Sequence, residues 1–198
     1  MQRAATLILG GMHGDEPKSV HVAAMLLELL MQDRQAASRG WIIVPIVNPD
    51  GYAIRSRRNA RGVDLNRNYP TADWQHASPR SRMYGGRTPA SEPETRTLIR
   101  LIRRRQPARI ISIHSISHGL YCNNYDGPAR GLAQRMRRFN RYPVRSTIGY
   151  PTPGSLGTWA GAGLGLPVVT LELPSHHSPQ RCWLENREAL LAAISASL

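Results

Sequence analysis

Residues 5–17 read ATLILGGMHGDEP, a short apolar run followed by two glycines and a polar turn that ends at a proline. An apolar run of this length, bounded by glycines, is typical of a buried β-strand. The proline stands where an α-helix can begin, and residues 17–33 carry apolar side chains at helical spacing. The segment therefore predicts a strand, a polar loop and a helix in direct succession.

The same alternation of strand and helix patterns continues along the chain. Strands are predicted at 5–11, 41–48, 108–115, 119–125 and 168–174, and helices at 17–33, 91–105, 128–140 and 181–197. The helix at 91–105 begins Ser-Glu-Pro-Glu, which has the form of a capping box with a proline in the first turn. Such alternation is typical of an α/β protein, and we expect residues 1–198 to form a single domain with a mixed β-sheet flanked by helices.

The stretch from Pro49 to Ala90 has little periodicity and many Gly, Pro, Asn and Arg residues. A loop of that length is uncommon in a compact domain unless it builds a functional site. We therefore expect this loop to contribute to the site.

The charge balance is strongly basic, with a formal net charge of +13. Lys18 is the only lysine among the 26 basic residues, and the arginine runs fall in segments with helical apolar spacing. Such runs are typical of a solvated helix face, so no nucleic-acid partner is expected. A positive field that attracts a small anionic substrate is the better-motivated use of this charge.

The remaining composition indicates where the protein works. No apolar stretch reaches the roughly 18 residues that cross a bilayer, and the N-terminal apolar run is too short for a secretory signal. The two cysteines, Cys122 and Cys182, lack the close spacing of a metal site and are interpreted as reduced core thiols. We therefore expect a cytoplasmic protein without a membrane partner; the sequence does not predict its oligomeric state.

Four polar residues stand at or just beyond the ends of predicted strands, where open α/β sheets place their active sites. His13 and Glu16 follow the first strand, His114 ends the third, and Glu172 lies near the end of the last. A catalytic zinc ion takes three protein ligands from His and carboxylate side chains and keeps an open position. The spacing favours His13, Glu16 and His114 as ligands, which leaves Glu172 free to act as a base.

A second cluster lies in the long loop, in SRRNARGVDLNRNYP at 56–70. It holds Arg57, Asn59, Asp64, Asn66 and Arg67. A planar guanidinium binds a carboxylate through two hydrogen bonds, and a neighbouring amide adds a directional one. The cluster is either an anion site or a chance grouping in an arginine-rich chain.

Six strings occur in a fixed order along the chain: HGDE, NPDGY, RNARGVDLNRNYP, ISIHS, GYPTPGS and TLELP. In this order they resemble the zinc carboxypeptidase family, which includes carboxypeptidase A. The forms GGMHGDEP and GYPTPGSLGTW are most similar to its bacterial murein peptide amidase A branch, which hydrolyses the γ-D-glutamyl–diaminopimelate bond of recycled cell-wall peptides. The resemblance implies a zinc metallopeptidase whose substrate is a small anionic peptide cleaved beside a free carboxylate.

The resemblance also implies roles for individual residues. His13, Glu16 and His114 match the ligands of one zinc ion, and Glu172 matches the glutamate that activates water and passes its proton to the leaving amine. His118, His176 and His177 are not expected to bind the metal.

Other matched positions concern the substrate. Asn66 and Arg67 match the pair that binds the terminal carboxylate, and Arg57 matches the arginine that stabilises the oxyanion, with Arg58 as a close rival. Tyr150 matches a mobile tyrosine that closes over the substrate.

The resemblance also indicates where the pocket for the released residue lies. The wall of the pocket for the released residue is expected between Tyr150 and Trp159, which offers Thr152, Ser155 and Thr158 and no charge. The chain begins at the strand before His13, so we expect one sheet edge to be shorter, or covered differently, than in larger relatives.

Two alternative functions stay open: an aspartoacylase-like deacylase of N-acyl amino acids, and a catalytically silent anion-binding protein of the same fold.

Overall fold

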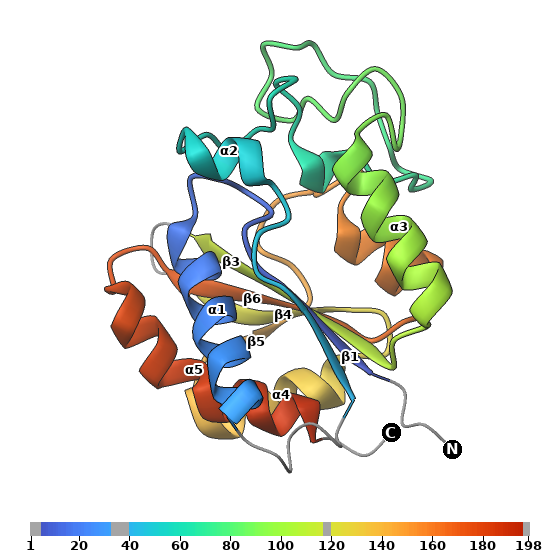
Figure 1. Cartoon of the computed structure of the whole chain (residues 1–198). Coiled ribbons are helices and arrows are strands. Elements are labelled where there is room, and N and C mark those ends of the chain that lie inside the picture. Colours follow the sequence, from blue (N-terminus) through green and yellow to red (C-terminus); the bar gives the residue numbers. More distant parts are fainter. Residues whose placement is uncertain (1–4, 33–39, 117–119, 196–198) are drawn as a thin grey trace.

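The computed structural model describes residues 5–32, 40–116 and 120–195, and within them six strands form one sheet. The strand order is β2-β1-β3-β6-β4-β5. The strands span Thr6–Leu9 (β1), Trp41–Val44 (β2), Arg109–Ile116 (β3), Cys122–Asp126 (β4), Val144–Arg145 (β5) and Val168–Pro174 (β6). Strand β4 runs antiparallel to β6, and every other neighbouring pair is parallel. The predicted α/β fold with a mixed sheet is confirmed (Figure 1).

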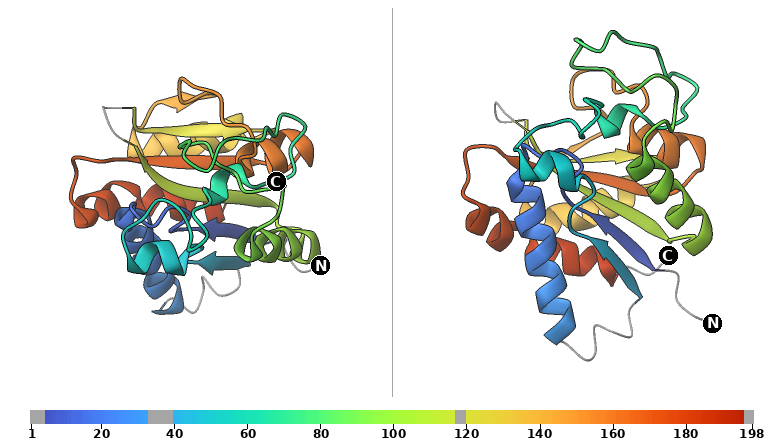
Figure 2. Two further views of the ribbon diagram at one scale, coloured as in Figure 1. Left: turned by 90° about the horizontal axis from the view of Figure 1, so that it is seen from above. Right: turned by 45° about the horizontal axis from the view of Figure 1, so that its top comes forward.

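Helices cover both faces of this sheet. They span Pro17–Gln32 (α1), Pro49–Ala53 (α2), Pro93–Arg105 (α3), Arg130–Asn140 (α4) and Pro179–Ile194 (α5), with a 3₁₀ turn at Leu65–Arg67 (η2) and a π-helix at Gly157–Gly163 (η3). Helices α1, α4 and α5 lie on one side of the sheet, and α3 and η3 lie on the other (Figures 1 and 2).

The two faces hold two separate apolar cores. Along β1, Ile8 packs into the core beneath α1, α4 and α5, whereas Leu7 and Leu9 pack into the core beneath α3 and η3. This is the consequence of side chains that alternate between the two faces of a strand. Strands buried on both faces read as continuous apolar runs, which is why they stand out in the sequence.

The predicted elements are found, with differences at their ends. The strand predicted at 41–48 ends at Val44, and residue 33 of the helix predicted at 17–33 lies outside the described residues. The helix predicted at 181–197 begins earlier, at Pro179, and residues 196 and 197 lie outside the described residues, as does residue 119 of the predicted fourth strand.

The prediction of a capping box at Ser91 was wrong. The N-cap of α3 is Glu92, and no side chain forms a capping hydrogen bond at this end of the helix. The Ser91 hydroxyl donates instead to the Glu92 carboxylate, because Asn68 of the long loop approaches this turn and donates to Ser91.

The parallel strands β1, β3 and β6 end at the same side of the sheet, where α2, η2 and the long loop also lie (Figure 2, right). Gly14, in the turn after β1, has no room for a side chain, because an added Cβ atom would lie 2.0 Å from the carbonyl carbon of Gly51 in α2. The backbones of the two loops therefore pack directly on each other and fix the turn that carries His13 and Glu16.

Cys122 and Cys182 are buried free thiols, and burial raises the pKa of Cys122 to about 12. None of the helices in the described part of the chain combines the length and the apolar character needed to span a membrane.

Candidate metal centre

His13 and Glu16 reach the site from the turn that follows β1. The backbone of this turn is held by Ser19, whose hydroxyl accepts from Gly11 N at 3.0 Å and donates to the Glu16 carbonyl at 2.7 Å. His114 comes from β3 and is paired in register with Glu172 on β6. The sheet thus brings together four residues that are far apart in the sequence.

Three of these side chains direct their donor atoms at one point. His13 Nδ1 lies 2.8 Å from Glu16 Oε1 and 3.2 Å from His114 Nδ1, and His114 Nδ1 lies 3.2 Å from Glu16 Oε2. Their possible ligand atoms all lie within 4.8 Å of one another, and all three residues are buried. Two imidazole nitrogens and a carboxylate facing each other in this way fit a zinc ion with an open coordination position.

Each imidazole is held from its far side. His13 Nε2 lies 3.0 Å from Asp64 Oδ1, and His114 Nε2 lies 3.0 Å from the Ser112 hydroxyl. Glu16 Oε2 also accepts from Ser115 N at 2.9 Å. Such outer partners fix the ring orientation of metal-binding histidines, so that here both Nδ1 atoms face inward.

The charges in this group are strongly coupled. Burial disfavours a charged imidazole, but the carboxylates of Glu16 and Asp64 outweigh this effect and raise the pKa of His13 to about 9. His13 and His114 in turn hold the pKa of Glu16 well below its usual range, although burial opposes them. Without a cation, His13 takes a proton to balance two carboxylates, which is the role a metal ion would fill.

Glu172 is buried beside the three candidate ligands. Burial, and after it the negative charge of Glu16, raises the pKa of Glu172 to about 8. A cation held by the neighbouring ligands would favour the ionised form and lower this pKa.

Three arginines of the long loop, Arg57, Arg67 and Arg82, border the same cavity, which has a volume of about 300 Å³. Arg57 Nε donates to Asp64 Oδ2 at 2.9 Å, which leaves one edge of its guanidinium toward Glu16. Arg67 is buried, yet it forms no ion pair with any carboxylate of the described residues. Burying an unpaired charge is costly, so the site favours an anion beside Arg67.

Asn66 adds an amide beside Arg67. Its Oδ1 accepts from Leu156 N at 2.9 Å, so its Nδ2 remains as a donor toward the cavity. Arg58 differs from Arg57, because it donates to the carbonyls of Pro79 and Ser81 in the long loop and does not line the cavity.

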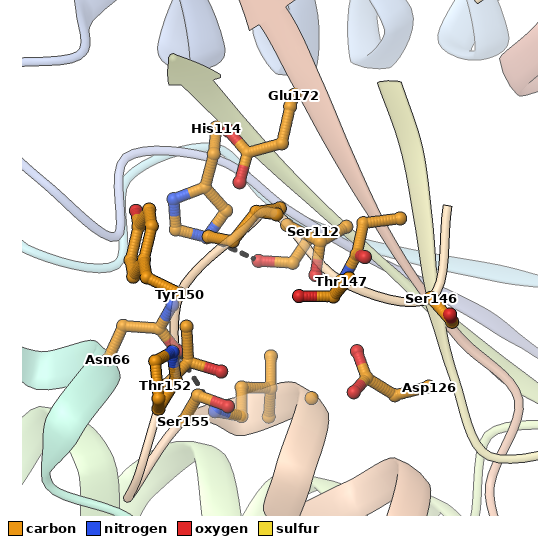
Figure 3. A pocket seen from close by; sticks show the side chains of 16 residues that line it. Asn66, Ser112, His114, Asp126, Ser146, Thr147, Tyr150, Thr152, Ser155 and Glu172 are labelled. Carbon is orange, nitrogen blue, oxygen red and sulfur yellow. Dashed lines mark hydrogen bonds between the residues drawn. The ribbon is translucent and has the colours of Figure 1, made fainter. Parts of the chain in front are cut away.

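Tyr150 lies in the loop after β5 and is 46% exposed. It borders the cavity together with His114, Glu172 and Asn66, and these four residues also line the adjoining cavity that Figure 3 shows. Its exposure and its position at the rim suit a side chain that can cover a bound molecule.

The structure thus brings all eight predicted site residues to one cavity, and their assigned roles remain predictions. His177 pairs with Glu185 instead, and His118 lies outside the described residues.

The residues that sequence reasoning missed as parts of the site include Asp64 and Asp126, and also Ser112, which contacts His114, and Arg82, which lines the cavity. Asp64 stands in the quoted loop cluster, but its contact with His13 depends on the fold; Asp126, on β4, lines an adjoining cavity and has no signal in the sequence.

Comparison with known proteins gives consistent matches. A family model described as zinc carboxypeptidase matches residues 1–127. Murein peptide amidase A of Escherichia coli K12 is 37% identical over 183 residues, which cover 87% of this chain and 72% of that protein.

Solved structures agree with the sequence matches. The crystal structure of a murein-tripeptide amidase from Escherichia coli O157 has a TM-score of 0.80 at 32% identity and covers 99% of this chain and 83% of that one. Bovine thrombin-activatable fibrinolysis inhibitor has a TM-score of 0.79 at 22% identity, with 98% of this chain and 80% of that one covered, and shows the same fold.

Proposed function

This chain belongs to the zinc carboxypeptidase family and is a metallopeptidase, and we propose that it is a murein peptide amidase. Its substrate is a murein peptide cleaved at the bond between γ-D-glutamate and meso-diaminopimelate. The observation that carries the proposal is the inward-facing set of His13, Glu16 and His114 with Glu172 and Arg67 in the same cavity. The similarity to murein peptide amidase A supports the choice of substrate.

His13, Glu16 and His114 would hold one zinc ion. When bound, zinc supplies Lewis acidity and lowers the pKa of water to about 7. Asp64 and Ser112 keep the two imidazoles in the orientation that this binding requires.

Glu172 is the general base and then the general acid. Its carboxylate accepts a proton from the attacking water and donates it to the nitrogen of the departing residue. Burial and the charge of Glu16 raise the pKa of this carboxyl, whereas His13 and Arg57 lower it.

Arg57 and Arg67 act on different parts of the substrate. Arg57 donates to the oxyanion that develops on the scissile carbonyl, and Asp64 fixes the direction of its guanidinium. Arg67, with Asn66, binds the free carboxylate of the residue that is released, which positions the bond next to Glu172. Tyr150 covers the bound peptide.

The proposal is tested by incubating the protein with L-Ala-γ-D-Glu-meso-diaminopimelate, with and without a chelator, and analysing the products by mass spectrometry. We expect free diaminopimelate and L-Ala-D-Glu, with release stopped by the chelator and restored by zinc. Release of alanine instead, or turnover that is indifferent to the chelator, would refute the proposal.

A further inference from the structure

A second cavity of about 190 Å³ adjoins the one that holds the candidate ligands. It shares Asn66, His114, Tyr150 and Glu172 with the first cavity and extends from them toward β4 (Figure 3). Because Asn66 and Arg67 bind the carboxylate of the released residue in the proposed function, this cavity lies where the side chain of that residue must go.

The far wall of this second cavity is formed by alternate residues of β4. Asn124 and Asp126 are two positions apart, so they project from the same face of the strand. Figure 3 shows the Asp126 carboxylate directed into the open part of the cavity. The wall expected between Tyr150 and Trp159 has no charge, but β4 adds a carboxylate that the linear sequence does not place there.

Both side chains lack a partner for their acceptor atoms. Asp126 is partly buried and forms no ion pair or side-chain hydrogen bond with the part of the chain that the structure describes, and burial raises its pKa. Asn124 Oδ1 is buried without a hydrogen-bond partner in the same part of the chain. An unpaired buried acceptor such as Asn124 Oδ1 is costly and rare, and at a cavity wall it indicates a missing donor.

Helix η3 leaves room for this carboxylate. A Cβ atom added to Gly157 would lie 2.4 Å from Asp126 Oδ2, so any larger residue there would push the carboxylate aside. The glycine therefore lets Asp126 stand at the cavity wall.

We propose that Asp126, together with Asn124, binds the side-chain ammonium of the residue that the enzyme releases, an inference that rests on the proposed function. An ammonium carries a positive charge and three donors, which match one carboxylate and one amide oxygen. Hydroxyls of Ser146, Thr147 and Ser155 line the same cavity and can donate to a carboxylate on the same side-chain carbon. The cavity thus fits the zwitterionic end of diaminopimelate, and Asp126 is its specificity-determining residue.

Four synthetic tripeptides L-Ala-γ-D-Glu-X separate the contributions of the side-chain ammonium and the side-chain carboxylate of diaminopimelate. With X as diaminopimelate both charges are present, lysine keeps only the ammonium, 2-aminopimelate keeps only the carboxylate, and norleucine has neither. For the wild type we expect kcat/KM to fall by about 10- to 100-fold from diaminopimelate to 2-aminopimelate, and likewise from lysine to norleucine, the range for a hydrogen bond to a charged group. If the wild type cleaves diaminopimelate and 2-aminopimelate peptides with equal kcat/KM, and lysine and norleucine peptides likewise, the inference is overturned by the wild type alone.

The variant Asp126→Asn keeps the shape of the side chain and removes its charge. In this variant we expect two ratios of kcat/KM, diaminopimelate over 2-aminopimelate and lysine over norleucine, to fall to within about threefold of one. Cleavage of the 2-aminopimelate peptide should be retained, which would show that the site is intact. Glu188→Gln on the exposed face of α5 removes one negative charge far from the cavity and should leave all four values unchanged.

The outcomes separate this inference from the function on which it rests. Cleavage of the diaminopimelate peptide with ratios that Asp126→Asn leaves unchanged would refute the role of Asp126 alone. Cleavage of none of the four peptides by the wild type would refute the proposed function and this inference with it.

Discussion

At the residue scale, the site depends on which nitrogen of each histidine is free. Asp64 and Ser112 engage the Nε2 atoms of His13 and His114, so both Nδ1 atoms meet Glu16. The sequence predicts the three candidate ligands, because they stand at strand ends. It does not predict Asp64 as the partner of His13, because 51 positions separate the two residues.

Glu172→Gln should lower kcat by about 10²–10⁴-fold on the murein tripeptide, because an amide cannot accept the proton of the attacking water. Zinc content and melting temperature should stay close to those of the wild type, since the substitution keeps the shape of a buried side chain. Steady-state kinetics and metal analysis check both expectations. Activity above about a tenth of the wild-type value would place the general base elsewhere.

Arg67→Ala should lower kcat/KM by about 10²-fold or more, because a charged hydrogen-bond pair to the substrate carboxylate is lost. Amidation of that carboxylate should reduce cleavage by the wild type to a similar extent and should have little further effect on the variant. Arg100→Ala, on the exposed face of α3, is the matched control and should behave as the wild type. Equal cleavage of the free and amidated peptides by the wild type would rule out this role of Arg67.

At the element scale, the sequence predicts the long elements and misses the short ones. Strands β3 and β6 are apolar runs buried on both faces, and α1 has a buried stripe, so each has a clear pattern. The two-residue strand β5, the single turn α2 and the π-helix η3 are too short or too irregular for periodicity to reveal them. Tertiary contacts position these short elements.

The contact between the turn after β1 and helix α2 can be tested through its glycine. Gly14→Ala places a Cβ atom on the Gly51 backbone and should destabilise the protein by about 1–3 kcal/mol and weaken zinc binding. Gly131→Ala is the matched control, because nothing lies within 4 Å of its added Cβ atom near the start of α4, and it should be neutral or stabilising by up to about 1 kcal/mol. Urea unfolding of both variants measures these changes; equal stability of the two would show that the turn tolerates a side chain.

At the scale of the whole molecule, the sheet topology decides which residues meet. Parallel pairing of β1, β3 and β6 brings His13, His114 and Glu172 to one end of the sheet, as the strand-end positions in the sequence predict. Asp126 reaches the adjoining cavity only because β4 runs antiparallel beside β6, with Asp126 opposite Val168. Strand direction is a property of the complete sheet, so no local pattern predicts Asp126 as part of the site.

Zinc stoichiometry of the purified protein tests whether His13, Glu16 and His114 hold one zinc ion. Inductively coupled plasma mass spectrometry should find about one zinc per chain in the wild type and less than about a tenth of that in His114→Ala, because removing one of three protein ligands opens the site. A wild-type protein that takes up no zinc after dialysis against it, or a His114→Ala variant that keeps a full equivalent, would show that these three residues do not form the zinc site.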